Sequence, residues 1–396
     1  MTQSNYISNL TPLRGIAAIL TVIFHANLYL GGALLSPEKS GLISKMYLMV
    51  DFFFILSGFI MMHVYGAWFS SSVTGESFKK FTIARFARVY PLHFFTLMYT
   101  ILLFSITAYL GIPKSPVGEI ANNGFSILTN LFLLQAMNLH NWFSWVHASW
   151  SISTEWWMYM LFPFLVVPFN KLNNVGRIIV TLLCFVGYLV ITFWIIPIIT
   201  IPPEIPFVRV NPADHTINVG YQYGFLRCLF GFVLGMMMHK GYVNNWGRNF
   251  LSNGYALLMA VVGLLICSHF QVADVFTVSF LPFILLSAAY GSVSVNKILS
   301  TTVLQKIGDW SFSIYLVHQP LFFTIGSIMS YLNPADPKAA PAGMPPPPPA
   351  LISWGLCLIY VGLSIFIAYL TYTFIETPAR YRINRKPQSV LNGAVA

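Results

Sequence analysis

Charged side chains are scarce in this sequence, since Asp, Glu, Lys and Arg make up only 8% of its 396 residues. In a soluble globular domain, about a quarter of the residues are charged. The composition therefore excludes a water-soluble enzyme, a soluble DNA-binding protein and a disordered chain. Hydrophobic residues reach 57%, and the mean hydropathy is +0.70. These values are typical of a polytopic membrane protein.

Cysteine is rare as well. The four cysteines lie inside apolar stretches without C-x-x-C spacing, which excludes a disulfide framework and a zinc site of the usual kinds. The sequence also contains no Gly-rich nucleotide loop and no cluster of metal-ligating residues. We therefore expect no metal ion and no permanently bound cofactor.

Long apolar runs dominate what is present. A bilayer core about 30 Å thick needs about 20 apolar residues per helix, so we expect an all-α protein with about ten transmembrane helices. These are predicted at 13–34, 46–68, 89–111, 153–169, 178–200, 221–238, 251–270, 274–292, 311–331 and 351–374. Residues 1–378 are predicted to form one membrane-embedded domain, followed by a short basic cytoplasmic tail at 379–396.

The basic residues predict the orientation of these helices. The net charge is +10, and most of the 21 Lys and Arg residues lie in alternate loops and in the C-terminal tail. The positive-inside rule then places both termini in the cytoplasm. Bilayer orientation explains this charge without a nucleic-acid partner. The first span is not a typical signal sequence, because no basic region precedes Thr11.

One segment, from Phe125 to Trp150, does not fit the count of spans. Its apolar part, Ile127 to Leu134, is too short to cross a bilayer. We expect a re-entrant or interfacial segment there.

Two ionisable residues share one face of the first predicted helix. Arg14 and His25 are eleven residues apart, which at 100° per residue is close to three full turns and gives about 16 Å of rise. Such a face predicts the lining of a channel that enters from the cytosol. The alternative is a snorkelling arginine and a histidine that only packs.

A second basic pair precedes the third span. Arg85 and Arg88 lie three residues apart, next to Lys79 and Lys80. Two arginines on one helical face suit a phosphate-bearing ligand, although the positive-inside rule alone also predicts basic residues here.

Carboxylates inside apolar runs need partners. Asp51 lies in V-D-F-F-F-I-L-S-G-F, so it must be paired or protonated. We expect His25 as its partner, because a carboxylate commonly orients a basic imidazole.

Aromatic residues surround another carboxylate. Glu155 lies near Trp150 and Trp156 at the outer start of the fourth span, where a carboxylate is unusual. Indole faces beside a carboxylate form a good surface for a sugar ring. His318 lies deeper in the ninth span, and Pro320 is expected to kink the helix beside it.

These motifs, in this order, resemble the acyltransferase-3 family of membrane acyltransferases over about Tyr6 to Arg382. The resemblance is carried by Arg14-x10-His25, by V-D-F-F-F-I-L-S-G-F at 50–59, by Arg85-x-x-Arg88 before Val89-Tyr90-Pro91, by S-W-S-I-S-T-E at 149–155, by F-S-I-Y-L-V-H at 312–318 and by F-I-E-T-P at 374–378.

The resemblance implies a ten-helix enzyme that moves an acyl group, usually acetyl, from cytosolic acyl-CoA to a hydroxyl of an exported or surface carbohydrate. It implies residence in the bacterial inner membrane, acetyl-CoA as co-substrate and a carbohydrate or glycolipid acceptor. His25 is then the catalytic residue, and Arg14, Arg85 and Arg88 serve the donor. Glu155 lies near the acceptor side. From the residues themselves we expect Asp51 and Glu155 to belong to the catalytic site with His25, and Trp150, Trp156 and His318 to contact the acceptor or support the site. The chain corresponds to the form without an added esterase-like domain.

The residues leave several alternatives open. His25 acts either as a base in direct transfer or as an acyl carrier. The acceptor is a carbohydrate, a lipid or a small hydrophobic molecule. A non-enzymatic transporter is a further alternative, although the two halves show no matching broken helices. A homo-oligomer and polysaccharide-assembly proteins remain open as partners.

Overall fold

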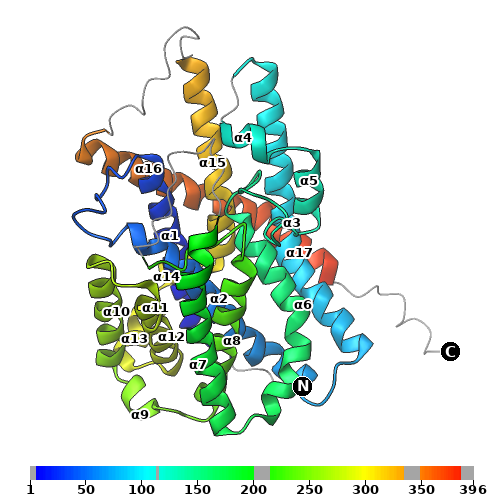
Figure 1. Ribbon diagram of the computed structural model, residues 1–396, viewed down its shortest axis with the longest axis vertical. Coiled ribbons are helices and arrows are strands. Elements are labelled where there is room, and N and C mark those ends of the chain that lie inside the picture. Colours follow the sequence, from blue (N-terminus) through cyan, green and yellow to red (C-terminus); the bar gives the residue numbers. More distant parts are fainter. Residues whose placement is uncertain (1–5, 113–115, 200–214, 334–347, 385–396) are drawn as a thin grey trace, which may run out of the picture.

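The computed structural model describes residues 6–112, 116–199, 215–333 and 348–384. Within these ranges every regular element is a helix (Figure 1), which confirms the predicted all-α class. The helices are α1 (Leu10–Tyr29), α2 (Met49–Tyr65), α3 (Gly75–Tyr109), α4 (Pro116–Ala121), α5 (Gly124–Leu131), α6 (Ser149–Lys171), α7 (Asn174–Val190), α8 (Gly224–Val243), α9 (Arg248–Leu251), α10 (Gly254–His269), α11 (Asp274–Val278), α12 (Phe280–Tyr290), α13 (Val293–Leu299), α14 (Thr302–Asp309), α15 (Ser311–Leu332), α16 (Ala350–Thr371) and α17 (Thr377–Asn384).

The described helices include fewer candidate membrane spans than predicted. Six are long and apolar enough to cross a bilayer, and a seventh exists if the pair Asp274–Tyr290 and Val293–Leu299, bent by 94°, is one span. Each of the ten predicted ranges still overlaps a helix. The difference arises because α10 has only 16 residues, and because α6 and α8 carry buried polar side chains that lower their hydropathy. The chain is a multi-pass membrane protein.

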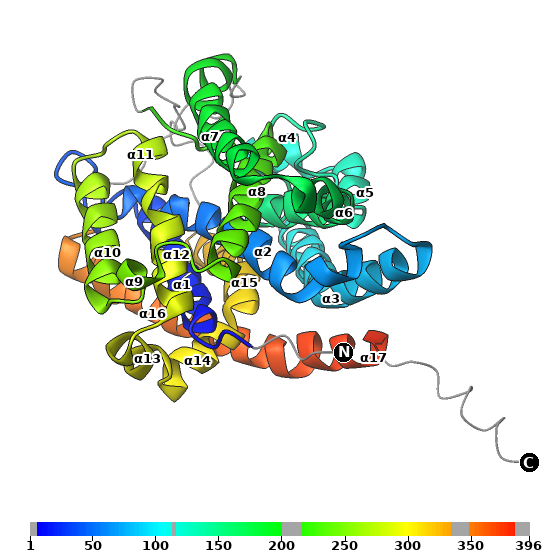
Figure 2. The same ribbon diagram turned by 90° about the horizontal axis from the view of Figure 1, so that it is seen from below.

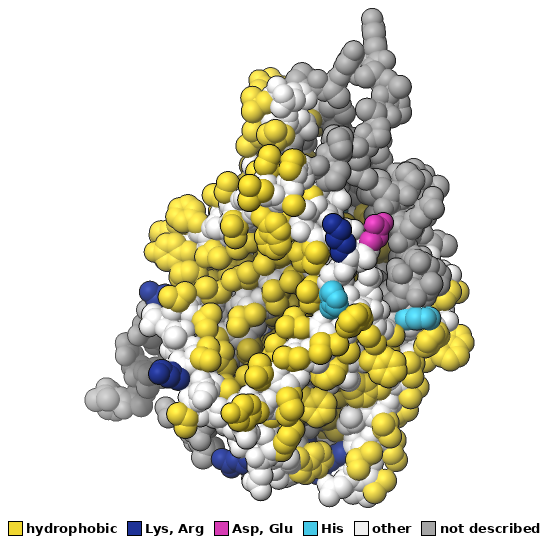
Figure 3. All heavy atoms as spheres, turned by 90° about the vertical axis from the view of Figure 1, so that its left-hand side faces the viewer, with side chains coloured by type: hydrophobic (Ala, Val, Ile, Leu, Met, Phe, Trp, Pro, Cys, Tyr) yellow, Lys and Arg dark blue, Asp and Glu magenta, His cyan; other side chains and the backbone are white. Residues whose placement is uncertain are grey.

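The surface agrees with a membrane environment. Figure 3 shows one face of the molecule, on which hydrophobic side chains predominate and charged side chains are few. Many large apolar side chains of α7, α10 and α16 are exposed, for example Leu182, Leu258 and Leu358. Exposed apolar surface of this extent is normal where lipid, rather than water, is the solvent.

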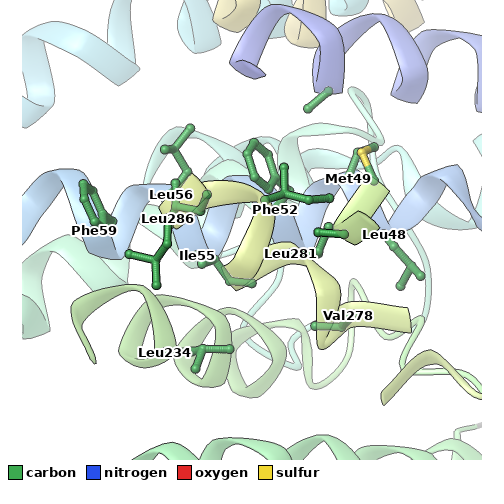
Figure 4. Packing of buried hydrophobic residues seen from close by; sticks show 14 of the residues in the cluster. Leu48, Met49, Phe52, Ile55, Leu56, Phe59, Leu234, Val278, Leu281 and Leu286 are labelled. Atoms are coloured by element: carbon green, nitrogen blue, oxygen red, sulfur yellow. The ribbon is translucent and has the colours of Figure 1, made fainter. Parts of the chain in front are cut away.

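Helices α2 and α8 pack closely, and glycines allow it. A Cβ atom at Gly235 would lie 1.8 Å from the Ile55 carbonyl oxygen, and one at Gly58 would lie 1.9 Å from the Phe232 carbonyl oxygen. The backbones therefore approach as small-residue motifs permit in membranes, and Gly231 and Gly235, four residues apart on α8, form such a motif. Figure 4 shows the apolar side chains of α2 against Leu234 of α8 and Leu281 and Leu286 of α12.

Helix α1 lies inside the bundle, among α2, α12, α14, α15 and α16 (Figure 2). Its close approach to α14 depends on Gly308, because a Cβ atom there would lie 2.2 Å from the Thr11 carbonyl oxygen. A central helix can present side chains to enclosed cavities along its length. Arg14 and His25 both lie on it.

Helix α3 has a defined start that positions its arginines. Thr74 accepts a hydrogen bond from the Ser77 backbone nitrogen, and the Ser77 hydroxyl accepts one from the Thr74 backbone nitrogen. This capping box satisfies two backbone donors at the helix start. Arg85 and Arg88 follow in the third and fourth turns.

The segment from Phe125 to Trp150 folds back against α3 and α15. It contains α5, which has eight residues and is too short to span a bilayer. His93 of α3 donates through Nε2 to the Asn130 carbonyl at 2.9 Å, and Tyr90 donates to the Leu131 carbonyl at 3.0 Å. Whether this segment re-enters the membrane stays a prediction.

The predicted basic tail begins within α17, which places Arg380 near α3 and the start of α1. Residues 385–396 lie outside the described residues.

Candidate active site

His25 lies one turn from the end of α1, and its hydrogen bond defines the tautomer. The Nδ1 atom is 2.9 Å from the carbonyl oxygen of Thr21, one turn earlier. Because a carbonyl only accepts, Nδ1 must carry the hydrogen. Nε2 then keeps its lone pair, which makes it the basic or nucleophilic nitrogen of His25.

A second histidine lies beside it. The ring centroid of His318, on α15, is 4.9 Å from that of His25. His318 is fully buried, and neither of its ring nitrogens has a hydrogen-bond partner among the described residues. The predicted kink residue, Pro320, lies within the same helix. We call His25 and His318 the histidine pair.

A cavity of about 510 Å³ opens near the start of α1. We call it the arginine cavity, and it is lined by the charged residues Arg14, Arg85, Arg88, Glu155, Asp309 and Arg380. Four of these six are cations, so the cavity attracts anions. Its volume lies in the range of small-molecule sites.

Arg85 is available to a ligand. One Nη atom donates to the Tyr65 hydroxyl at 2.8 Å, and the guanidinium lies over the Tyr65 ring at 4.9 Å. The Nε atom is buried and has no partner among the described residues. A buried donor without a partner costs about 1–3 kcal/mol, so a ligand oxygen that accepts from it would bind favourably.

Arg88, in contrast, binds a buried carboxylate of the protein itself. It forms an ion pair with Glu376, which also accepts a hydrogen bond from Ser313 at 2.9 Å. Glu376 is 1% exposed, and such a buried carboxylate requires a cation beside it. Arg85 and Arg88 are therefore not equivalent, although both line the cavity.

Glu155 also lines the arginine cavity. Its Oε1 atom accepts from Tyr159 at 2.5 Å and from Ser57. The structure therefore places Glu155 beside the three arginines, because the second turn of α6 faces the arginine cavity. Its role near the acceptor stays a prediction.

A second cavity, of about 500 Å³, lies near the end of α1. We call it the aromatic cavity, and its ring-bearing lining residues are Tyr29, Phe104, Trp145, His147, Phe322 and Phe323. Its polar lining residues are Ser105, Thr107, Asn122, Ser327 and Ser330. No Asp, Glu, Lys or Arg side chain in the described part of the chain lines it.

The histidine pair lies between the walls of the two cavities. On one side, the His318 ring centroid is 5.9 Å from that of Tyr315, which lines the arginine cavity. On the other, the His25 ring centroid is 6.1 Å from that of Tyr29, which lines the aromatic cavity. A chain of ring contacts, from Tyr315 through His318 and His25 to Tyr29, therefore links the two cavity walls.

Asp51 does not bind His25, and the predicted pairing is wrong. Both carboxylate oxygens of Asp51 accept from Arg227 of α8, at 3.0 Å from Nε and 2.6 Å from Nη2. Both side chains are fully buried. Asp51 pairs with Arg227 because a buried permanent cation needs a carboxylate. His25 needs no carboxylate, because its Nδ1 hydrogen is bound by the Thr21 carbonyl.

The two tryptophans predicted to support the acceptor line neither cavity. Trp150 packs against Phe54 and lies under the guanidinium of Arg227 at 5.5 Å. Trp156 packs against Phe86 of α3 with ring centroids 6.1 Å apart. Both residues therefore contribute to packing in this structure.

Sequence reasoning missed the aromatic cavity. Tyr29 and His147 were not singled out, because a tyrosine or histidine in an apolar segment carries no distinctive spacing. Tyr315 is distinguished in the sequence only as part of the motif F-S-I-Y-L-V-H at 312–318. Arg227 did offer a signal, since a lone arginine inside an apolar helix predicts a buried carboxylate partner.

A metal centre has no support in the described residues, where no group of three or more His, Cys, Asp and Glu side chains could hold an ion.

Several known proteins are similar to this chain in sequence. Residues 7–373 match the family described as "Acyltransferase domain". The peptidoglycan O-acetyltransferase OatA of Listeria monocytogenes is 21% identical over 95% of this chain, which corresponds to 56% of OatA's own length. The acyltransferase MdmB of Streptomyces mycarofaciens is 25% identical over 96% of this chain and 93% of its own. Protein 2 in the picA locus of Rhizobium radiobacter is 34% identical, over 37% of this chain and 75% of its own.

No solved structure matches the chain. The family match covers almost the whole sequence and includes α1, both arginines of α3 and the histidine of α15. The chain therefore belongs to the acyltransferase-3 family and is a membrane acyltransferase.

Proposed function

We propose that this protein is an O-acetyltransferase of the bacterial cytoplasmic membrane. It takes acetyl from acetyl-CoA in the arginine cavity, on the cytoplasmic side, and transfers it to a hydroxyl of an exported carbohydrate in the aromatic cavity, on the opposite side. His25 performs the transfer as base or as acyl carrier.

One observation carries this proposal: two cavities at opposite ends of α1 with the histidine pair between them. Arg14 and Tyr29, which line the two cavities, are fifteen residues apart on α1, or about 22 Å of helix. An acyl group that moves from one cavity wall to the other along these ring contacts would pass His25. This arrangement supports transfer across the membrane.

The arginine cavity suits coenzyme A. Its phosphates need cations that donate several hydrogen bonds, and arginine meets this need. Arg85 has an unused buried donor, and Arg14 and Arg380 add positive charge. The cavity continues from these residues to Phe53 and Tyr315, which gives the neutral pantetheine arm an apolar route toward the histidine pair.

The aromatic cavity suits a neutral sugar. Trp145 and Tyr29 provide ring faces on which the C–H face of a sugar can pack, and Asn122 and the serines provide partners for its hydroxyls. Because none of the described lining side chains is a carboxylate, lysine or arginine, the acceptor need not carry charge at the reacting unit. The name of OatA, a peptidoglycan O-acetyltransferase, favours a glycan as well.

A small hydrophobic acceptor is the second candidate. Phe104, Phe322 and Phe323 in the cavity wall would also hold a flat apolar molecule. Family membership assigns acyltransferase chemistry to the chain. The hypothesis of a non-enzymatic transporter therefore has no support.

The experiment measures donor binding and acceptor use separately in the purified protein. Arg85→Ala should weaken acetyl-CoA binding about 10- to 100-fold, which is the loss expected for one charge-assisted contact. Lys79→Ala is the matched control, because Lys79 is an exposed cation of the same helix outside the cavity. CoA release is then measured with neutral oligosaccharides, peptidoglycan fragments and apolar alcohols as acceptors.

The proposal predicts saturable acetyl-CoA binding and release of CoA that sugars accelerate. Equal binding by the Arg85→Ala and Lys79→Ala variants would argue against the arginine cavity as the donor site. Acceleration by apolar alcohols alone would favour the second candidate.

A further inference from the structure

His147 is a third histidine near the reacting centre. It lines the aromatic cavity, where its ring centroid is 5.2 Å from that of Phe323 and 5.9 Å from that of Phe143. Tyr29 lines the same cavity, and its ring centroid is 6.1 Å from that of His25. Tyr29 is the other titratable side chain among the described residues that line this cavity. His147 is therefore the one imidazole among the described residues that line this cavity.

The backbone beside His147 is held in place from α15. The Ala148 nitrogen donates to the Gln319 side chain, and the Ala148 carbonyl accepts from the Tyr315 hydroxyl at 3.1 Å. Gln319 and Tyr315 flank His318 in the sequence. The same helix thus fixes His318 against His25 and fixes the residue that follows His147. Positioning of this kind is what a catalytic base requires.

His147 is uncharged in its resting state. It lies in the segment between α5 and α6, outside the candidate membrane spans. Burial, and to a smaller extent the nearby His25, lower the pKa of His147 to about 4. The imidazole is therefore neutral at physiological pH and able to accept a proton.

The chemistry requires a second base if His25 carries the acyl group. Nδ1 of His25 is used by the Thr21 carbonyl, so Nε2 is the atom that can be acylated. Once Nε2 is bonded to the acyl carbon, it has no lone pair left for the proton of the acceptor hydroxyl. Another group on the acceptor side must take that proton.

We propose that His147 is the base that removes the proton from the acceptor hydroxyl while that hydroxyl attacks acyl-His25. This inference rests on the proposed function and on the acyl-carrier route within it. First, Nε2 of His25 attacks the thioester carbonyl, the C–N bond forms, the C–S bond breaks, and CoA leaves as a thiolate that takes a proton from water. Second, the acceptor oxygen attacks the acyl carbon, the C–N bond breaks, and His147 takes the hydroxyl proton and later releases it to water.

The test separates these two steps. Purified protein in detergent is incubated with radiolabelled acetyl-CoA, and label on protein is followed over time. The label is then chased with water alone or with methyl β-glucoside as a probe hydroxyl. The variants are His147→Gln, His147→Gly with and without added imidazole, and the control His140→Gln. His140 belongs to the same segment, bonds to Thr129 and does not line the aromatic cavity.

We expect His147→Gln to acquire label as fast as wild type and to lose it about 100-fold more slowly, which is the typical contribution of a general base. Added imidazole should speed the loss of label from His147→Gly and leave wild type unchanged. His140→Gln should behave as wild type.

Three results would overturn the inference alone: equal loss of label from His147→Gln and wild type, failure of His147→Gln to acquire label, or transfer by wild type without labelled protein. Absence of any reaction between wild type and acetyl-CoA would overturn the proposed function as well. The two failures are thus distinguishable.

Discussion

The partners of individual ionisable residues show which of them are free to react and which stabilise the fold. His25 is held by a backbone carbonyl, which leaves Nε2 available. Asp51 and Glu376 are held by Arg227 and Arg88, and both carboxylates are almost completely buried. Removing one partner of a buried ion pair leaves an uncompensated charge, which costs more than the pair itself contributes.

The Asp51 and Arg227 pair provides the first prediction. Asp51→Ala should lower the free energy of unfolding by about 3–5 kcal/mol, because Arg227 is then buried without its carboxylate. The double variant Asp51→Leu with Arg227→Met should recover most of that loss. Thermal unfolding in detergent measures both effects.

The same double variant also tests the role of Asp51 in catalysis. Because Asp51 does not contact His25, we expect the folded double variant to retain CoA release. A stable double variant without any CoA release would show that Asp51 acts on the chemistry after all.

The two arginines of α3 should respond differently to substitution. Arg88→Ala should lower the melting temperature, because it leaves Glu376 without its cation, whereas Arg85→Ala should lower acetyl-CoA affinity at nearly unchanged melting temperature. Pairing Arg88→Ala with Glu376→Gln should restore part of the stability. Thermal unfolding measures the stability of both variants, and a binding titration measures their affinity for acetyl-CoA. A lower melting temperature for Arg85→Ala than for Arg88→Ala would contradict this prediction.

Among the elements, the α2 and α8 contact depends on glycine rather than on interlocking side chains. Gly235→Val should destabilise the protein by at least about 1–3 kcal/mol, the usual cost of overpacking, because the added atoms would overlap the Ile55 carbonyl. Gly362→Val on α16 is the matched control, since a Cβ atom there meets nothing within 4 Å. Similar melting temperatures for the two variants would contradict the packing of α2 on α8.

Sequence patterns predicted elements and local faces well and long-range partners poorly. Helical spacing placed Arg14 on the face of α1 that reaches the arginine cavity, and apolar length located every predicted helix. Spacing carries no information on which helix meets which, so it could not show that Arg227 of α8 would reach Asp51 of α2. Nor could it show that Glu155 would face the arginine cavity. Hydropathy also predicted more spans than the described helices support by length and composition, because α10 is short and α6 and α8 carry buried polar side chains.

On the scale of the whole molecule, the two cavities differ in chemistry as well as position. Cations line the cavity near the start of α1, whereas aromatic rings and hydroxyls line the cavity near its end. A polyanionic donor and a neutral acceptor would thus bind at separate places and meet at the histidine pair. From the positive-inside pattern of the sequence we predict that the arginine cavity faces the cytoplasm.

The most direct measurement of this account uses sealed vesicles that contain the protein in one known orientation, with acetyl-CoA supplied to one face at a time. CoA release is measured for wild type and for His25→Ala. The account predicts release by wild type only when acetyl-CoA reaches the face that carries the start of α3, and no release by His25→Ala from either face. Release from acetyl-CoA supplied only to the opposite face, or undiminished release by folded His25→Ala, would contradict it.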